Sequence, residues 1–176
     1  MAKTQIPLPT SRKRPENKQS IPHIEPIKAY KRPFTPKKEN MRSISLIIIH
    51  CSATPEGKDY TVEDIDRWHR ARGFRCIGYH YVIYRDGTVH TGRPVAEVGA
   101  HCLNRNAHSI GICYIGGLAK DGKTPKDTRT AEQKAALLDL LKRLKSQYPK
   151  AAIFGHRDFA AKACPSFNAK EEYKHL

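Results

Sequence analysis

Long apolar stretches are missing from this chain of 176 residues. No run of about 18 apolar residues occurs, so the sequence contains no typical membrane-spanning helix. The N-terminus also lacks the apolar core of a secretory signal peptide, and we therefore expect a cytoplasmic protein. Internal repeats are missing too. The length then predicts one globular domain with an appendage, and we expect a monomer.

A regular cysteine pattern is missing. The five cysteines are Cys51, Cys76, Cys102, Cys113 and Cys164. An odd number without a regular spacing provides no disulfide framework, which excludes the small secreted disulfide scaffolds. We expect isolated thiols in a reducing compartment.

Acidic residues are few compared with basic ones. The chain has 17 Asp and Glu against 32 Lys and Arg, a net charge of +15. Residues 1–40 alone carry ten Lys or Arg and three Glu. A basic surface of this kind attracts nucleic acid, anionic lipid or an acidic cell-wall polymer, and the charge does not choose among them.

Prolines interrupt the N-terminal segment repeatedly. They are Pro7, Pro9, Pro15, Pro22, Pro26, Pro33 and Pro36. Because proline breaks helices and sheets, and because the segment has little apolar periodicity, we predict a disordered basic arm over residues 1–42. Residues 43–176 are then the folded domain, and the arm is a candidate contact for anionic polymers.

The stretch from Leu46 to Thr54 organises the predicted domain. Four aliphatic residues, three of them β-branched, occupy 46–49 and are typical of a buried central strand. His50 follows where this strand should end, beside small and polar residues. Because α/β proteins place their chemistry at strand ends, His50 is a candidate metal ligand.

Strands and helices alternate along the rest of the domain. Thr61 and Thr130 each have the pattern of a helix N-cap, and Asp86-Gly87 is typical of a hairpin turn. We predict strands at 78–84, 89–91, 109–115 and 151–154, helices after 61 and 130, a loop over 99–108, and a short helix at 169–173. This order predicts an α/β fold: a single domain with a central mixed β-sheet flanked by helices.

Two further candidate metal ligands lie near the other end of the chain. His156 and Cys164 follow the apolar run 151–154. Zinc accepts imidazole and thiolate ligands, and a catalytic site uses three protein ligands. His50, His156 and Cys164 meet that number if the first and last strands are neighbours. On the residues alone, a structural histidine at a strand end remains the commoner explanation.

Several short motifs agree in order and separation with a known family. They are Ile49-His50-Cys51-Ser52-Ala53-Thr54, Gly78-Tyr79-His80, Arg85-Asp86-Gly87-Thr88, Gly99-Ala100-His101, Ser109-Ile110-Gly111, Gly155-His156-Arg157-Asp158 and Lys162-Ala163-Cys164-Pro165-Ser166-Phe167. Over residues 43–173 the chain resembles the zinc-dependent N-acetylmuramoyl-L-alanine amidases of the phage-lysozyme and peptidoglycan-recognition-protein type. The resemblance implies hydrolysis of the amide between N-acetylmuramic acid and L-alanine in peptidoglycan.

The resemblance also implies roles for single residues. The zinc ligands of the family fall on His50, His156 and Cys164, its active-site tyrosine on Tyr79 and its active-site lysine on Lys162. A Lys ammonium or a Tyr hydroxyl near the metal can stabilise an oxyanion by a directed hydrogen bond. His101 lies in a loop that resembles the cleft wall of the family and is a candidate substrate contact. No Asp or Glu in these motifs is an obvious general base, which leaves the proton-shuttling group open.

Three other functions compete with this interpretation. The same fold can bind peptidoglycan without cleaving it, and loss of the Cys164 ligand would mark that branch. Cys51 with a nearby histidine could form a cysteine hydrolase, which an alkylating agent would inhibit where a chelator would not. The net charge suggests a nucleic-acid-binding protein, although the arm has only Tyr30 and Phe34 as aromatic partners. As an amidase, the protein would reach the cell wall after release in phage lysis, or would act on recycled muropeptides.

Overall fold

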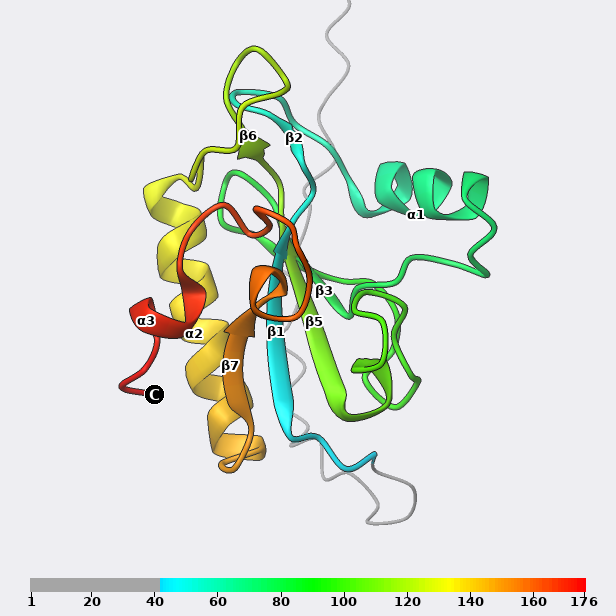
Figure 1. Cartoon of the computed structure of the whole chain (residues 1–176), viewed down its shortest axis with the longest axis vertical. Helices are drawn as coiled ribbons and strands as arrows, with labels where there is room; N and C mark the ends of the chain where they lie inside the picture. Colours follow the sequence, from blue (N-terminus) through cyan, green and yellow to red (C-terminus); the bar gives the residue numbers. More distant parts are fainter. Residues whose placement is uncertain (1–41) are drawn as a thin grey trace, which may run out of the picture. The chain divides into compact units, whose positions relative to one another are not determined.

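The computed structural model describes residues 42–176, so all of the predicted arm except Arg42 lies outside the described residues. Figure 1 labels the strands and helices. They are β1 (Leu46–Cys51), β2 (Thr54–Pro55), α1 (Val62–Ala71), β3 (Tyr81–Ile83), β4 (Val89–Thr91), β5 (Ser109–Tyr114), β6 (Gly117–Leu118), α2 (Ala131–Gln147), β7 (Ala152–Gly155) and α3 (Ala169–Glu172), with 3-10 turns η1 (Asn106–His108) and η2 (His156–Asp158).

The main sheet has the order β4-β3-β5-β1-β7. β1 lies between β5 and β7 and is parallel to both, whereas β3 and β4 form an antiparallel hairpin. The mixed sheet predicted from the sequence is therefore confirmed. Ile49 of β1 lies opposite Gly155 of β7, so the residues that follow this pair, His50 and His156, lie at the same edge of the sheet.

Helices cover both faces of the sheet. Leu137, Leu141 and Leu144 of α2 are buried against Ile47 and Ile49 of β1. On the opposite face, a second cluster packs Ile65 of α1 with residues of β3 and β5. Figure 1 shows α2 alongside the sheet next to β7 and α1 on the far side of the molecule. The residues of β1 that face α2 alternate along the strand, as the period of a strand requires.

Both predicted helix starts are confirmed. Thr61 and Asp64 exchange side-chain-to-backbone hydrogen bonds at the start of α1, and Thr130 and Gln133 do the same at α2. Each pair satisfies two N–H groups that the first turn leaves without partners. Gln133 also donates from Nε2 to the carbonyls of Ile83 (3.1 Å) and Ile115 (3.0 Å), which ties α2 to the ends of β3 and β5.

One strand is shorter than predicted, the predicted loop includes a short turn, and a small second sheet was not predicted. The strand expected at 78–84 is limited to β3, so Tyr79 precedes the strand. The loop expected at 99–108 contains the turn η1. The two-residue strands β2 and β6 form a small second sheet that the sequence analysis did not predict, because strands this short carry no periodic pattern.

Long-range contacts of two arginines hold the edges of the domain. Arg42 donates to the carbonyls of Val95 (2.9 Å), Asn106 (3.0 Å), Ala107 (3.0 Å) and Ser109 (3.2 Å). Arg129 is buried, pairs with Asp127 and Glu172 and lies 3.3 Å from the ring centroid of Phe167. The contacts of Arg129 anchor the C-terminal segment that follows Cys164.

Among the described residues, no helix is both long and apolar enough to cross a membrane.

Candidate active site

Three side chains converge at the carboxyl edge of the sheet. They come from the end of β1, from the turn directly after β7, and from the loop that follows this turn. His50 is near the end of β1 and is 1% exposed, His156 begins η2 directly after β7, and Cys164 lies in the loop that follows. One ligand atom from each of the three lies within 4.8 Å of the other two. The distance from Nδ1 of His50 to Sγ of Cys164 is 3.8 Å.

These three donors fit a zinc ion. Two imidazoles and one thiol are a donor set that zinc accepts, and three protein ligands leave a fourth position open. A tetrahedral ion with ordinary zinc–nitrogen and zinc–sulfur distances needs a nitrogen and a sulfur about 3.6 Å apart. The observed 3.8 Å between His50 and Cys164 is close to that value.

Backbone contacts hold the loop that carries Cys164. The N–H of Cys51 donates to Sγ of Cys164 (3.3 Å), and the N–H of Arg157 donates to the Cys164 carbonyl (2.7 Å). The hydroxyl of Tyr114 donates to the carbonyl of Pro165 (2.6 Å). The second of these contacts joins the turns that carry His156 and Cys164, so the two candidate ligands are held relative to one another.

The turn η2 is braced by Asp158. Its Oδ2 accepts a hydrogen bond of 2.8 Å from the N–H of Gly155. Gly155 also has no room for a side chain, because a Cβ there would lie 2.7 Å from Cδ of Pro165. The Gly-His-Arg-Asp motif thus orients His156 through its first and last members, with the carboxylate supporting the turn from outside the ligand set.

The other ring nitrogen of His50 faces His101. Nε2 of His50 and Nδ1 of His101 are 3.0 Å apart, and Nε2 of His101 is 3.2 Å from Oγ of Ser109. Burial and the neighbouring histidines lower the pKa of His50 well below its usual range and the pKa of His101 to about 3. Both rings are therefore neutral at pH 7, and the neutral ring is the form that binds metals.

Tyr79 and Lys162 lie beside these candidate ligands. The ring centroid of Tyr79 is 5.0 Å from that of His50. Burial, with nearby thiols, raises the pKa of Tyr79 well above its usual range, so its hydroxyl remains a hydrogen-bond donor at neutral pH. Lys162 is exposed, and its positive charge contributes to the lowered pKa of both His50 and His156. The site thus offers a neutral donor and a cation near the same ligands.

Other histidines of the region serve the fold. Nδ1 of His69 accepts a hydrogen bond from the N–H of Gly78 (2.8 Å), and Nδ1 of His80 accepts one from the N–H of Gly111 (2.9 Å). Neither imidazole belongs to the group of candidate ligands. Ser109 lies in one of the motifs quoted above, but its contact with His101 was not predicted, because a serine at a strand start does not indicate its partner.

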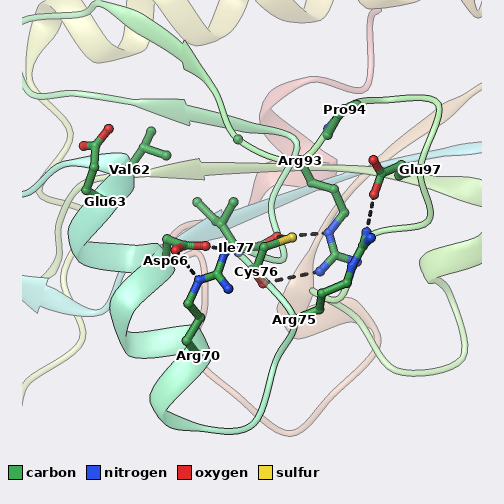
Figure 2. A pocket seen from close by; sticks show the side chains of 11 residues that line it. Val62, Glu63, Asp66, Arg70, Arg75, Cys76, Ile77, Arg93, Pro94 and Glu97 are labelled. Carbon is green, nitrogen blue, oxygen red and sulfur yellow. Dashed lines mark hydrogen bonds and ion pairs between the residues drawn. The ribbon is translucent and has the colours of Figure 1, made fainter.

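A separate hollow lies on the flank of α1, with a volume of about 630 Å³. Figure 2 shows that α1 supplies one wall, including Asp66 and Arg70, and that Arg75, Arg93 and Glu97 come from the segments opposite. Arg70 pairs with Asp66, and Arg75 pairs with Glu97. Arg93 donates to three backbone carbonyls. The charges in this hollow therefore bond mainly to the protein itself.

Comparison with known proteins gives one family and its relatives. The family described as N-acetylmuramoyl-L-alanine amidase matches residues 40–167. An endolysin of Enterobacteria phage K11 is 41% identical over 141 residues, which is 80% of this chain and 90% of that protein.

Solved structures of other proteins share the fold. The N-acetylmuramoyl-L-alanine amidase LysC from Clostridium intestinale has a TM-score of 0.64 at 30% identity, with 78% of this chain and 86% of that chain covered. A mutant of Drosophila PGRP-LB, solved in complex with tracheal cytotoxin, has a TM-score of 0.63 at 26% identity, with 75% and 80% covered.

Proposed function

The chain belongs to the N-acetylmuramoyl-L-alanine amidase family and is an amidase that acts on peptidoglycan, and we propose that it works with one zinc ion held by His50, His156 and Cys164. The observation that carries the proposal is the convergence of one ligand atom from each residue within 4.8 Å. Because these residues come from two parallel strand ends and a braced loop, a rigid scaffold supports the ligand set.

The bound metal would supply Lewis acidity: zinc polarises a carbonyl oxygen and lowers the pKa of a bound water molecule to about 7. The protein supplies the remaining groups. We assign to Lys162 and Tyr79 the stabilisation of the oxygen that becomes negative when the amide carbonyl is attacked. A cation and a neutral hydroxyl beside the ligands are suited to that role, since both donate hydrogen bonds.

The substrate is the amide between the lactyl group of N-acetylmuramic acid and L-alanine, in wall fragments or in intact peptidoglycan. The endolysin relatives favour action on the cell wall during phage lysis over recycling of muropeptides. A purely binding role is disfavoured, because Cys164 accompanies both histidines in the candidate ligand group.

Measurements of zinc content and of hydrolytic activity on the same set of variants test this proposal. The wild-type protein should bind about one zinc per chain, and His156→Ala and Cys164→Ser should each lose both zinc and hydrolysis of a soluble muropeptide. Cys76→Ser is the matched control, because Cys76 is a half-buried thiol outside the ligand group. The ligand assignment is wrong if Cys164→Ser retains stoichiometric zinc, or if Cys76→Ser loses it.

A further inference from the structure

We propose that His101 is a positioning residue of the metal centre, which accepts the Nε2–H of His50 and so directs the bare Nδ1 of His50 toward the metal. The inference deepens the proposed function and rests on it, because it assumes that His50 is a ligand. It starts from the 3.0 Å contact between Nε2 of His50 and Nδ1 of His101.

The direction of this hydrogen bond follows from the tautomers. Nδ1 of His50 lies on the side of Cys164, so a metal there needs the lone pair of that nitrogen. The proton of neutral His50 is then on Nε2, and Nδ1 of His101 must accept it. His101 in turn carries its own proton on Nε2 and donates to Oγ of Ser109 at 3.2 Å. Ser109, His101 and His50 thus form one chain of hydrogen bonds that ends at the metal position.

The backbone at His101 is fixed by Asn106. Oδ1 of Asn106 accepts hydrogen bonds from the N–H groups of His101 and Cys102, both at 2.9 Å. Ser109, the acceptor at the far end of the His101 ring, is fully buried at the start of β5. The ring is therefore held at its base and at its tip by groups that belong to the protein.

Two glycines leave the space that the His101 ring fills. A Cβ at Gly111 would lie 2.6 Å from Cγ and Cδ2 of His101, and a Cβ at Gly99 would lie 2.6 Å from Cδ2. Both distances are far below van der Waals contact, so a side chain at either position would displace the ring. Gly111 lies in the middle of β5, where a glycine weakens a strand, and close approach of the ring accounts for its presence there.

This role differs from the substrate contact that the sequence suggested for His101. The residue is only 8% exposed, and both ring nitrogens have partners within the protein. A ligand that used either nitrogen would first have to break a buried hydrogen bond. Partners of this kind, which lie behind a metal-binding histidine, set its tautomer and its orientation.

Zinc affinity measured by chelator competition tests the inference without using activity. His101→Ala should weaken zinc binding about 10- to 100-fold, the usual effect of removing such a partner. His101→Asn should recover most of the affinity, since Oδ1 of asparagine is the same number of bonds from Cα as Nδ1 of histidine and accepts the same proton. Ser109→Ala should have a smaller effect in the same direction.

His69→Ala is the matched control. His69 is also buried, at 3% exposure, but it bonds the N–H of Gly78 and not a candidate ligand. It should lower the melting temperature of the metal-free protein and leave zinc affinity unchanged. Equal zinc affinity in wild type and His101→Ala, or an equal loss in His69→Ala, would overturn the positioning role. A wild-type protein that binds no zinc would overturn the metal site itself, and this inference with it.

Proton–nitrogen NMR of the zinc-loaded wild-type protein gives a second readout, which does not depend on whether any variant folds. Long-range proton–nitrogen correlations should show His50 and His101 each protonated on Nε2, with a slowly exchanging proton between Nε2 of His50 and Nδ1 of His101. A His50 ring protonated on Nδ1, or a His101 ring protonated on Nδ1, would contradict the inference even if every His101 variant failed to fold.

Discussion

The backbone N–H of Cys51 donates a hydrogen bond of 3.3 Å to Sγ of Cys164, a residue 113 positions further along the chain. The contact joins the end of the central strand to the loop of the third candidate ligand. The Cys51 side chain is buried in the core cluster of the α2 face, where a Cβ at Gly117 would lie 2.4 Å from its sulfur. Cys51 therefore supports Cys164 through its backbone N–H, whereas its thiol packs in the core and lies 3.9 Å from Oγ of Ser166.

Replacement of the Cys51 thiol should consequently leave the metal site in place. We expect Cys51→Ala to retain about one zinc per chain and most of the amidase activity, with a loss of stability of about 1 kcal/mol from the small cavity. Zinc content and turnover of a soluble muropeptide are the measurements. An inactive Cys51→Ala protein that still holds zinc would favour the cysteine-hydrolase alternative, in which Cys51 is the nucleophile.

Tyr79→Phe and Lys162→Ala should separate catalysis from metal binding. Each should lower kcat by about 100-fold or more if it supplies a hydrogen bond to the developing oxyanion. Zinc affinity and melting temperature should change little, because neither residue belongs to the candidate ligand group. Tyr81→Phe and Lys120→Ala are matched controls outside the site. Wild-type turnover in either test variant would remove that residue from the mechanism.

Acidification should destabilise the metal-free protein between about pH 6.5 and pH 4. Burial lowers the pKa of both His69 and His80 to about 4, against about 6.5 in an unfolded chain. In this pH window the unfolded chain binds more protons than the folded protein, so the free energy of unfolding falls as pH falls. Above about pH 6.5 these two histidines no longer change the free energy of unfolding with pH. Each histidine lowers the free energy of unfolding by up to about 1.4 kcal/mol per pH unit of acidification.

Urea unfolding with a chelator present, at several pH values, measures this dependence. His69→Asn is the informative variant, because its amide oxygen can still accept the hydrogen bond from Gly78 but does not titrate in this range. The slope of stability against pH should be smaller in His69→Asn than in wild type. Identical slopes would mean that His69 does not carry its share of the acid sensitivity.

Removal of the basic arm should leave the folded domain intact. A chain that starts at Met41 retains all five proposed metal and catalytic residues, so hydrolysis of soluble muropeptides should be unchanged. Activity on insoluble anionic cell walls should fall, because the lost segment carries ten Lys or Arg. That difference should shrink as salt rises, since the screening length falls from about 30 Å at 0.01 M to about 8 Å at 0.15 M.

Arg42 provides the control for that boundary. It contacts four backbone carbonyls of the folded domain, so Arg42→Ala in the shortened chain should lower the melting temperature, whereas removal of residues 1–40 should not. Unfolding of the chain that starts at Met41 would show instead that the arm is structural. It would also move the domain boundary toward the N-terminus.

Periodic and local features of the fold were predictable from the sequence. The capping residues Thr61 and Thr130 satisfy N–H groups within one turn, so the sequence nearby contains the whole signal. The aliphatic run 46–49 predicts a buried strand for the same reason. The strand order of the sheet depends on packing between distant segments, and no local pattern encodes it.

The candidate site also has a part that the sequence predicts and a part that it does not. The motif residues His50, His156 and Cys164 could be singled out because histidine and cysteine have metal-binding chemistry of their own. The bond between His50 and His101 could not be predicted, because it depends on the space that Gly99 and Gly111 leave for one ring. Contacts that depend on shape at close range have no signature in a single sequence.

The most direct test of zinc-dependent amide hydrolysis is mass spectrometry of the products released from purified peptidoglycan. The metal-free protein, the zinc-reconstituted protein and the reconstituted Cys164→Ser variant should be compared. We expect only the reconstituted wild type to release stem peptides with a free L-alanine amino group and glycans that keep a lactyl carboxylate. Cleavage between sugars, or the same peptide release by the metal-free protein, would contradict the account.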